Sequence, residues 1–204
     1  MAFKKNRKAT LLPVLAAGLG VVLIALAVSL PARTSPTMNH VETPAAAYPP
    51  QDSGCQSVLD AGEKLFTTPY HMYATQTDPG IQNGKPMSSE SISVGGAIYV
   101  MVNGKWSPGA FSLEEMKQRY QQNKKTVHNV SCHFVRDESV NGESTALYNT
   151  HEETEHGKND NQMWVSKGKG LVVKQEMDID IGGGRPKSHF SARYEYTNVQ
   201  APKM

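Results

Sequence analysis

The feature that most constrains this chain is an alternation of side chains between Leu171 and Ile181. The odd positions of this stretch are apolar apart from Gln175, and the even positions are charged apart from Val172. Apolar and polar residues that alternate with a period of two predict a β-strand with one buried and one solvated face. Residues 189–199 repeat the pattern. We therefore expect a sheet whose apolar face rests against a core or lines a cavity.

Short turns separate most of the expected strands. Asn-Gly pairs stand at residues 83–84, 103–104 and 141–142, and this pair is a strong signal for a tight hairpin turn. Short connections join antiparallel neighbours. The expected strands cover about 69–77, 88–96, 97–106, 127–136, 144–151, 162–166, 171–181 and 189–199.

Two helices accompany these strands. Apolar residues recur at helical spacing over 55–66, and Pro69 ends that helix. Ser112 and Glu115 match a capping box, which begins a helix over 112–124. These elements predict an α+β fold. It is a strongly curved antiparallel sheet of about eight strands, a half-open β-barrel, with two helices covering its concave face.

The first fifty residues differ from the rest of the chain. Four basic residues among the first eight precede an uncharged apolar run over 11–30. This order is typical of an export signal whose basic end stays inside. The length of the run favours an uncleaved membrane helix, whereas Ala25-Leu26-Ala27 is a candidate cleavage site. Residues 1–32 are therefore a signal peptide or a signal-anchor transmembrane segment, and both interpretations stay open.

Composition divides the remainder into a linker and a domain. Residues 33–53 are rich in Pro, Ala, Ser and Thr without periodicity, which indicates a linker. Residues 54–204 form the exported domain. Five of the 21 Lys and Arg residues and one of the 19 Asp and Glu residues precede residue 51, so the domain carries a net charge near −2. Without a basic stripe, nucleic acid is not an expected partner.

The sequence contains two cysteines, Cys55 and Cys132, both in the exported part. An even number of cysteines in an oxidising compartment suggests one disulfide. A disulfide between Cys55 and Cys132 would close a loop of 77 residues. Such a closure contributes roughly 4–5 kcal/mol of stability in the chain-entropy model. The alternatives are two unpaired buried thiols or a metal pair, although neither cysteine belongs to a C-x-x-C motif.

No motif points to an enzyme. His151 and His156 are five residues apart, one more than in the zinc motif H-E-x-x-H, so we interpret HEETEH as a solvated turn. Asp178 and Asp180 lie with Glu176 on one strand face, which fits a solvated surface better than acid/base chemistry. We expect no catalytic residue, no metal ligand and no cofactor.

The turn that joins the expected strand over 162–166 to the one over 171–181, together with the residues next to it, resembles a sequence pattern of a known family. The residues that carry the resemblance are Trp164, Val165, Gly170, Leu171 and Lys174. They resemble the W-(I/V)-x…G-L-(P)-x-(K/R) step of the LolA/LolB-like lipoprotein-carrier superfamily, which includes related mycobacterial lipoproteins. The usual Pro after Leu is Val172 here. Together with the order of elements over 55–202, this resemblance implies a half-barrel that holds a hydrophobic ligand.

Aromatic, Met and aliphatic residues are the candidates for lining such a cavity, because Met is flexible and Tyr carries a polar tip. Plain core packing is the alternative for the same side chains. The candidates are Tyr70, Met72, Met116, Tyr120, Phe134, Tyr148, Trp164, Leu171, Val173, Met177, Ile179, Tyr194 and Tyr196.

These observations lead to one functional hypothesis and one alternative. The hypothesis is an exported envelope protein that binds a lipid, an acyl chain or a lipoprotein's acyl moiety in the concave face. Its domain lies in the periplasm of a bacterial envelope, tethered to the inner membrane by residues 11–30 or secreted after cleavage. The alternative is a structural or sensor module without ligand, in which Met116, Tyr120 and Phe66 fill the cavity.

Overall fold

The computed structural model describes residues 55–154 and 157–204. The signal or anchor predicted for residues 1–32 and the linker predicted for residues 33–53 lie outside the described residues. Among the helices that are described, none combines the length and the apolarity needed to cross a membrane.

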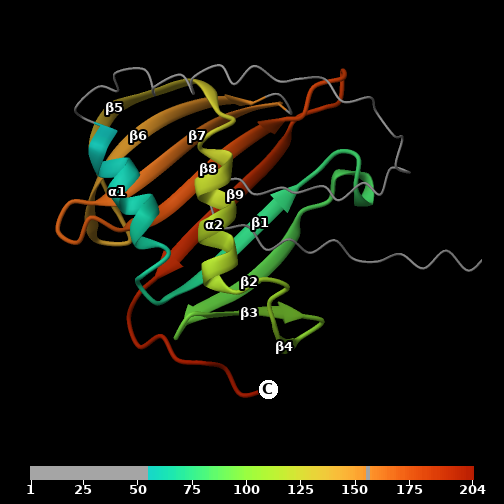
Figure 1. The fold of residues 1–204 in the computed structure, drawn as a ribbon, viewed down its shortest axis with the longest axis vertical. Helices are drawn as coiled ribbons and strands as arrows, with labels where there is room; N and C mark the ends of the chain where they lie inside the picture. Colours follow the sequence, from blue (N-terminus) through green and yellow to red (C-terminus); the bar gives the residue numbers. More distant parts are fainter. Residues whose placement is uncertain (1–54, 155–156) are drawn as a thin grey trace, which may run out of the picture.

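Nine antiparallel strands form one sheet with the order β4-β3-β2-β1-β9-β8-β7-β6-β5 (Figure 1). Their bounds are β1 Tyr70–Thr77, β2 Met87–Val94, β3 Ala97–Val102, β4 Lys105–Pro108, β5 His128–Val140, β6 Glu143–Thr154, β7 Gly157–Ser166, β8 Val172–Asp180 and β9 Ser188–Glu195. Within the described residues β4 and β5 stay unpaired edges, so the barrel is half open. The predicted α+β half-barrel is thus confirmed.

Tight hairpin turns account for the extra strand. Asn103 and Gly104 both have positive φ, of 51° and 76°, and they form the predicted hairpin turn, which joins β3 to β4 where residues 97–106 had been counted as one of about eight strands. Asn141 and Gly142 make the same kind of turn, with φ of 52° and 82°. Two central residues with positive φ match the twist of the flanking strands. The third Asn-Gly pair lies in the short 3-10 turn η2, Gln82–Gly84.

Helices α1, Gln56–Lys64, and α2, Leu113–Asn123, lie across the same face of the sheet (Figure 1). The predicted capping box begins α2. The Ser112 hydroxyl accepts from the Glu115 backbone amide at 3.2 Å, and the Glu115 carboxylate accepts from the Ser112 amide at 2.7 Å. Within the part of the chain that the structure describes, the sheet therefore has one face covered by helices and one face without them, called below the helix-covered and the helix-free face.

The main apolar core lies between the helices and the sheet. It joins Val58, Leu65 and Phe66 of α1 and the turn after it with Met116 and Tyr120 of α2 and with side chains of β1, β6, β7, β8 and β9. A second, smaller cluster of Leu147, Trp164 and Val173 is separate from it. Because side chains alternate along a strand, this cluster belongs to the helix-free face.

A β-bulge in β8 explains why Val173 leaves the main core. Val165 pairs with Val172 and Trp164 pairs with Lys174, so Val173 is an extra residue in the ladder. One extra residue reverses the facing of the strand on either side of it. Val172 is therefore fully buried in the main core, whereas Val173 packs on Leu147 and Trp164. The expectation of one continuous apolar line through Leu171, Val173, Met177 and Ile179 was wrong at Val173.

Candidate functional site

A narrow space lies between the two helices and strands β5 to β8 on the helix-covered face. Its volume is about 60 Å³. One side is apolar and is formed by Val58 and Leu59 of α1, Tyr120 of α2, and Met163 and Met177 of the sheet. The other side is polar. The space is therefore amphipathic, with its apolar wall against the helices.

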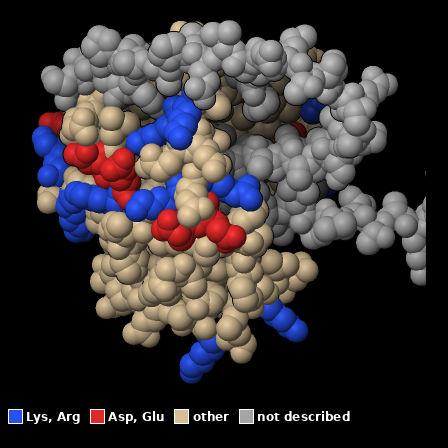
Figure 2. Space-filling view, viewed as in Figure 1, with Lys and Arg blue, Asp and Glu red and all other residues tan. Residues whose placement is uncertain are grey.

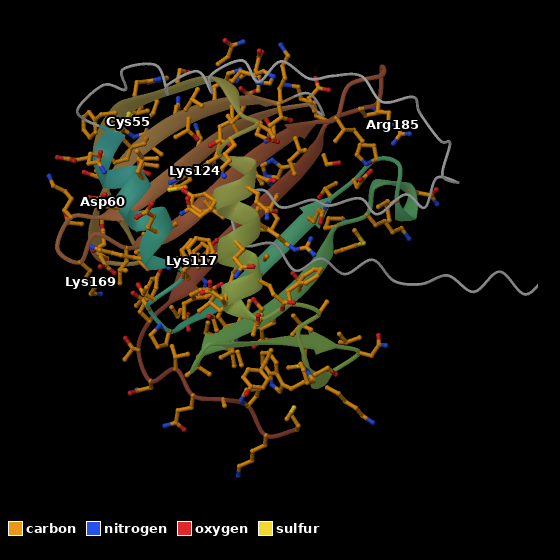
Figure 3. All side chains as sticks on the ribbon, viewed as in Figure 1. Cys55, Asp60, Lys117, Lys124, Lys169 and Arg185 are labelled. Carbon is orange, nitrogen blue, oxygen red and sulfur yellow. A yellow bond between two sulfur atoms is a disulfide. The ribbon has the colours of Figure 1, made fainter. Side chains whose placement is uncertain are left out.

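The disulfide closes one end of this space. Cys55 stands at the start of α1 (Figure 3) and is bonded to Cys132 on β5, so the predicted pairing is present. The bond fixes α1 to an edge strand of the sheet. Helix α2 has no covalent tie of this kind, since the only two cysteines of the sequence are used.

Helix α2 is attached to the rest of the domain by few side chains. Its buried residues are Met116 and Tyr120. The Tyr120 ring lies 5.2 Å from the Phe66 ring, and burial raises the pKa of its phenol. The Lys124 ammonium lies 3.2 Å from the Glu63 carboxylate and 4.6 Å from the centre of the Tyr120 ring (Figure 3). A helix with so small a buried face is the element of this site that can move at least cost.

Four side chains of β6 and β7 form the polar side. In the register, Thr150 lies opposite Asn161 and Glu152 lies opposite Asn159, and all four line the space. The side-chain oxygen of Asn161 is buried and has no hydrogen-bond partner among the described residues. Desolvation raises the pKa of Glu152, while His151 and Lys124 lower it by a smaller amount.

Sequence reasoning missed these four residues, because Thr, Asn and Glu in a polar segment resemble a solvated surface. The available signal was strand alternation, which runs from Tyr148 to Thr150 and Glu152 on β6 and from Met163 to Asn161 and Asn159 on β7. Tyr148 lies in the main core, and strand periodicity places Thr150 and Glu152 on the same face.

Most predicted cavity residues gather in the main core, and few of them line the space. The core contains Tyr70, Met72, Met116, Tyr120, Tyr148, Met177, Ile179 and Tyr194. Tyr196 packs against its edge and donates a hydrogen bond to the Val172 carbonyl at 2.5 Å. Leu171 is buried just before β8. Only Tyr120 and Met177 of the predicted set border the space of about 60 Å³.

Three predicted cavity residues lie elsewhere. Trp164 and Val173 face the helix-free side, because of the strand alternation and the bulge described above. Phe134 is 50% exposed on the edge strand β5, where its ring contacts that of Tyr148 at 5.8 Å between centroids. An edge strand lacks a neighbour that could cover such a side chain.

The helix-free face also carries a hollow, of about 870 Å³. Lys174 lies over the Trp164 ring at 4.3 Å and pairs with Glu176 at 2.7 Å. Arg193 lies over the Tyr73 ring at 4.7 Å and pairs with Glu195 at 2.7 Å. Each of these two cations already contacts an aromatic ring and a carboxylate, so this surface resembles the solvated outer layer of a sheet.

Two His–Asp pairs extend that layer. His151 and Asp160 approach to 2.7 Å, as do His189 and Asp178 to 2.8 Å. The Asp160 hydrogen bond raises the pKa of His151. A turn was expected over HEETEH, but β6 continues to Thr154, and His156 lies outside the described residues. Among the residues that are described, no group of three or more His, Cys, Asp or Glu side chains is arranged to hold a metal ion.

The surface of the helix-covered side mixes both signs of charge. Figure 2 shows basic and acidic side chains interspersed over the helices, with mostly uncharged surface toward the part of the sheet that carries β3 and β4. No broad field of one sign is visible on this side, which fits the near-neutral charge of the domain.

Comparison with known proteins identifies a resemblance in the solved structures alone. No family model matches the chain, and no curated protein matches it. The Mycobacterium tuberculosis lipoprotein LppX is 14% identical, with a TM-score of 0.40 over 71% of this chain and 94% of that one. LprF from Mycobacterium bovis is 11% identical, with a TM-score of 0.40 over 75% and 98%.

A putative outer membrane lipoprotein-sorting protein domain from Vibrio parahaemolyticus is 8% identical, with a TM-score of 0.24 over 71% of this chain and 93% of that one. The likeness is one of fold. At these identities and TM-scores, it carries nothing about the family or the ligands of this chain.

Proposed function

We propose that this protein reversibly binds the apolar chain of a lipid, or the acyl chain of a lipoprotein, beneath α2 on the helix-covered face. The observation that carries the proposal is the amphipathic space under the helices, next to a helix anchored by Met116 and Tyr120. The protein acts as a binding protein and not as an enzyme.

Binding requires movement, because about 60 Å³ is too small for an acyl chain. When α2 moves outward, Met116 and Tyr120 leave the core, and the chain takes their place against Met163 and Met177. Each buried methylene contributes about 0.8 kcal/mol. The free energy gained by burying an acyl chain of ordinary length therefore offsets the free energy lost when Met116 and Tyr120 become exposed.

The proposal includes the cellular location inferred from the sequence. The domain stands on the periplasmic side of a bacterial envelope, held by residues 11–30 or released after cleavage. The Cys55–Cys132 disulfide supports an oxidising compartment. A lipid surface or an acylated protein is the partner in either case.

A second candidate is a structural or sensor module without ligand. The favouring observation is that Phe66, Met116 and Tyr120 are all at least 92% buried and belong to the main core between the helices and the sheet. In this case α2 is a permanent part of the core, and no chain enters.

A filling substitution at Leu59 separates the two candidates. Leu59 borders the space and is only partly buried, so Leu59→Trp occupies the space without overpacking the deep core. Membranes that contain the full chain are irradiated with an acyl probe carrying a diazirine and an alkyne, and labelled peptides are identified by mass spectrometry. We expect labelling of β7 and β8 in the wild type and its loss in Leu59→Trp.

Two variants serve as controls. Leu59→Ala widens the space and keeps the labelling, and Asp60→Trp adds the same ring at the next, exposed position of α1 without blocking the site. Equal labelling of Leu59→Trp and wild type contradicts the proposal, and so does an absence of label from β7 and β8 in every variant.

A further inference from the structure

The polar side of the space presents hydrogen-bond acceptors without matching donors. The Asn161 side-chain oxygen is buried and lacks a partner within the described part of the chain. The Glu152 carboxyl, which is partly buried and makes no hydrogen bond or ion pair there either, lines the same space. Buried acceptors are normally hydrogen-bonded, so this end of the space is chemically incomplete.

The nearest cation is already engaged. Lys124 acts on Glu152 electrostatically, but its ammonium contacts the Glu63 carboxylate at 3.2 Å and lies over the Tyr120 ring. His151, the neighbour of Glu152 in the chain, pairs with Asp160 on the helix-free face. Neither group supplies a donor to Asn161 or Glu152.

The apolar and polar sides are continuous. Asn161 lies opposite Met177 on β8 and opposite Thr150 on β6, and Thr150 in turn lies opposite Cys132 of the disulfide. A chain lying along Met163 and Met177 therefore brings its polar end to Asn161 and Glu152. The existing space of about 60 Å³ is comparable to roughly two water molecules, which suits a hydroxymethyl or ammonium group.

We infer that Glu152 and Asn161 select amphiphiles whose headgroup donates hydrogen bonds and carries no negative charge. Hydroxyls of a glycerol or sugar headgroup and a protonated amine both meet this requirement. A carboxylate or phosphate does not, since it places acceptors and negative charge against a carboxyl and an amide oxygen. The inference rests on the proposed function, because it names the ligand class of the same site.

Three photoreactive probes with one acyl chain test the inference. They carry the diazirine and alkyne at the same carbons and end in a glycerol ester, a primary amine or a carboxylate. Membranes with the full chain are labelled at equal probe concentration, and the yield on β7 and β8 peptides is quantified. We expect the glycerol or amine probe to label about tenfold better than the carboxylate probe, the effect of one unmade buried hydrogen bond. Comparing the labelling yields of the glycerol probe and the amine probe shows whether the site prefers hydroxyl groups or an ammonium group.

Glu152→Gln is the decisive variant. It keeps the shape of the side chain, removes the negative charge and adds an N–H donor, so the preference against the carboxylate probe falls to about twofold or less. Glu153→Gln is the matched control, because Glu153 pairs with Lys158 and with His151 of the helix-free face and leaves the preference unchanged.

The outcomes separate this inference from the proposed function. Equal labelling of the site by all three probes, or a preference that Glu152→Gln leaves intact, overturns the selectivity and leaves chain binding standing. Absence of label at the site with every probe overturns both. Thermal unfolding of each variant verifies that it is folded.

Discussion

Glu152 and Glu153 are neighbours on β6 and meet opposite surroundings. Desolvation beneath the helices raises the pKa of Glu152. Hydrogen bonds from Lys158 and Asn129 lower the pKa of Glu153 to about 2. The desolvation of Glu152 lowers the stability of the folded state. A destabilising carboxyl inside a pocket is typical of a residue that serves a function.

These shifts predict opposite effects of pH on two variants. Relative to Glu152→Gln, the wild type is most stable below the unfolded pKa of Glu152 and loses that advantage as pH rises through the higher folded pKa. Glu152→Gln therefore gains stability over the wild type between pH 4 and pH 7. For Glu153 the stabilisation is present above the unfolded pKa and is lost as pH falls toward about 2, so Glu153→Gln is destabilised at pH 7.

Denaturant unfolding of the three proteins at about pH 4 and pH 7, which bracket the ordinary carboxyl range and neutrality, measures both effects. If Glu152→Gln is less stable than the wild type at pH 7, the carboxyl has a partner that stabilises it, and its role as an unpaired acceptor is wrong.

At the scale of elements, α2 is the part of the domain on which access to the site depends. Its N-terminus is held by the capping box of Ser112 and Glu115. Met116 and Tyr120 are its buried residues, and Leu113 packs against the core while partly exposed. Helix α1, in contrast, is bonded to β5. The two helices that cover one face thus differ in how firmly they are attached.

Removing the cap is expected to loosen α2 selectively. Ser112→Ala removes the hydroxyl that accepts from the Glu115 amide, which costs about 1 kcal/mol. Amide hydrogen exchange over 113–123 should accelerate, and an acyl photoprobe should label β7 and β8 faster. Ser57→Ala, at an exposed position of α1, is the control. Unchanged exchange in α2 would show that the cap does not govern its opening.

The sequence predicted the facing of β8 well beyond the bulge and failed at the bulge itself. From Gln175 to Ile179 the odd residues are buried as expected. Nothing in the alternation of Val172, Val173 and Lys174 distinguishes a regular ladder from one with an extra residue, because both valines are apolar. The bulge depends on pairing with Trp164 and Val165, which is tertiary information.

The candidate site was only partly predictable for a similar reason. Tyr120 and Met177 were identified as cavity residues from their type, and both border the space. Asn159, Asn161 and Glu152 were missed, because polar residues become buried here only through the placement of α1 and α2 over β6 and β7. The pattern of one strand does not contain the position of a helix far away in sequence.

At the scale of the molecule, the domain is a half-open barrel of nine strands in which one disulfide joins α1 to the sheet. The expected fold class followed from turn signals, strand alternation and a capping box, which are local features. The order of the strands, with β1 next to β9, unites distant parts of the chain. A sheet of this kind has edges at β4 and β5, and the disulfide secures α1 to one of them.

The disulfide should account for a large part of the stability. It closes a loop between residues 77 apart, and the chain-entropy model gives about 4–5 kcal/mol for such a closure. Replacing Cys55 and Cys132 together by Ser should lower the unfolding free energy by about that amount. Reductant should lower the stability of the wild type and leave the double variant unchanged. An unaffected wild type would show that the bond contributes little.

Organic extraction of the purified full chain, followed by mass spectrometry, measures whether a lipid chain is bound beneath α2. Lipids that associate only with the apolar N-terminal run appear equally in the wild type and in Leu59→Trp, so the comparison isolates the site. We expect a lipid that accompanies the wild type in a fixed ratio and is missing from Leu59→Trp. Identical lipid content in the two proteins would contradict the binding of a chain beneath α2.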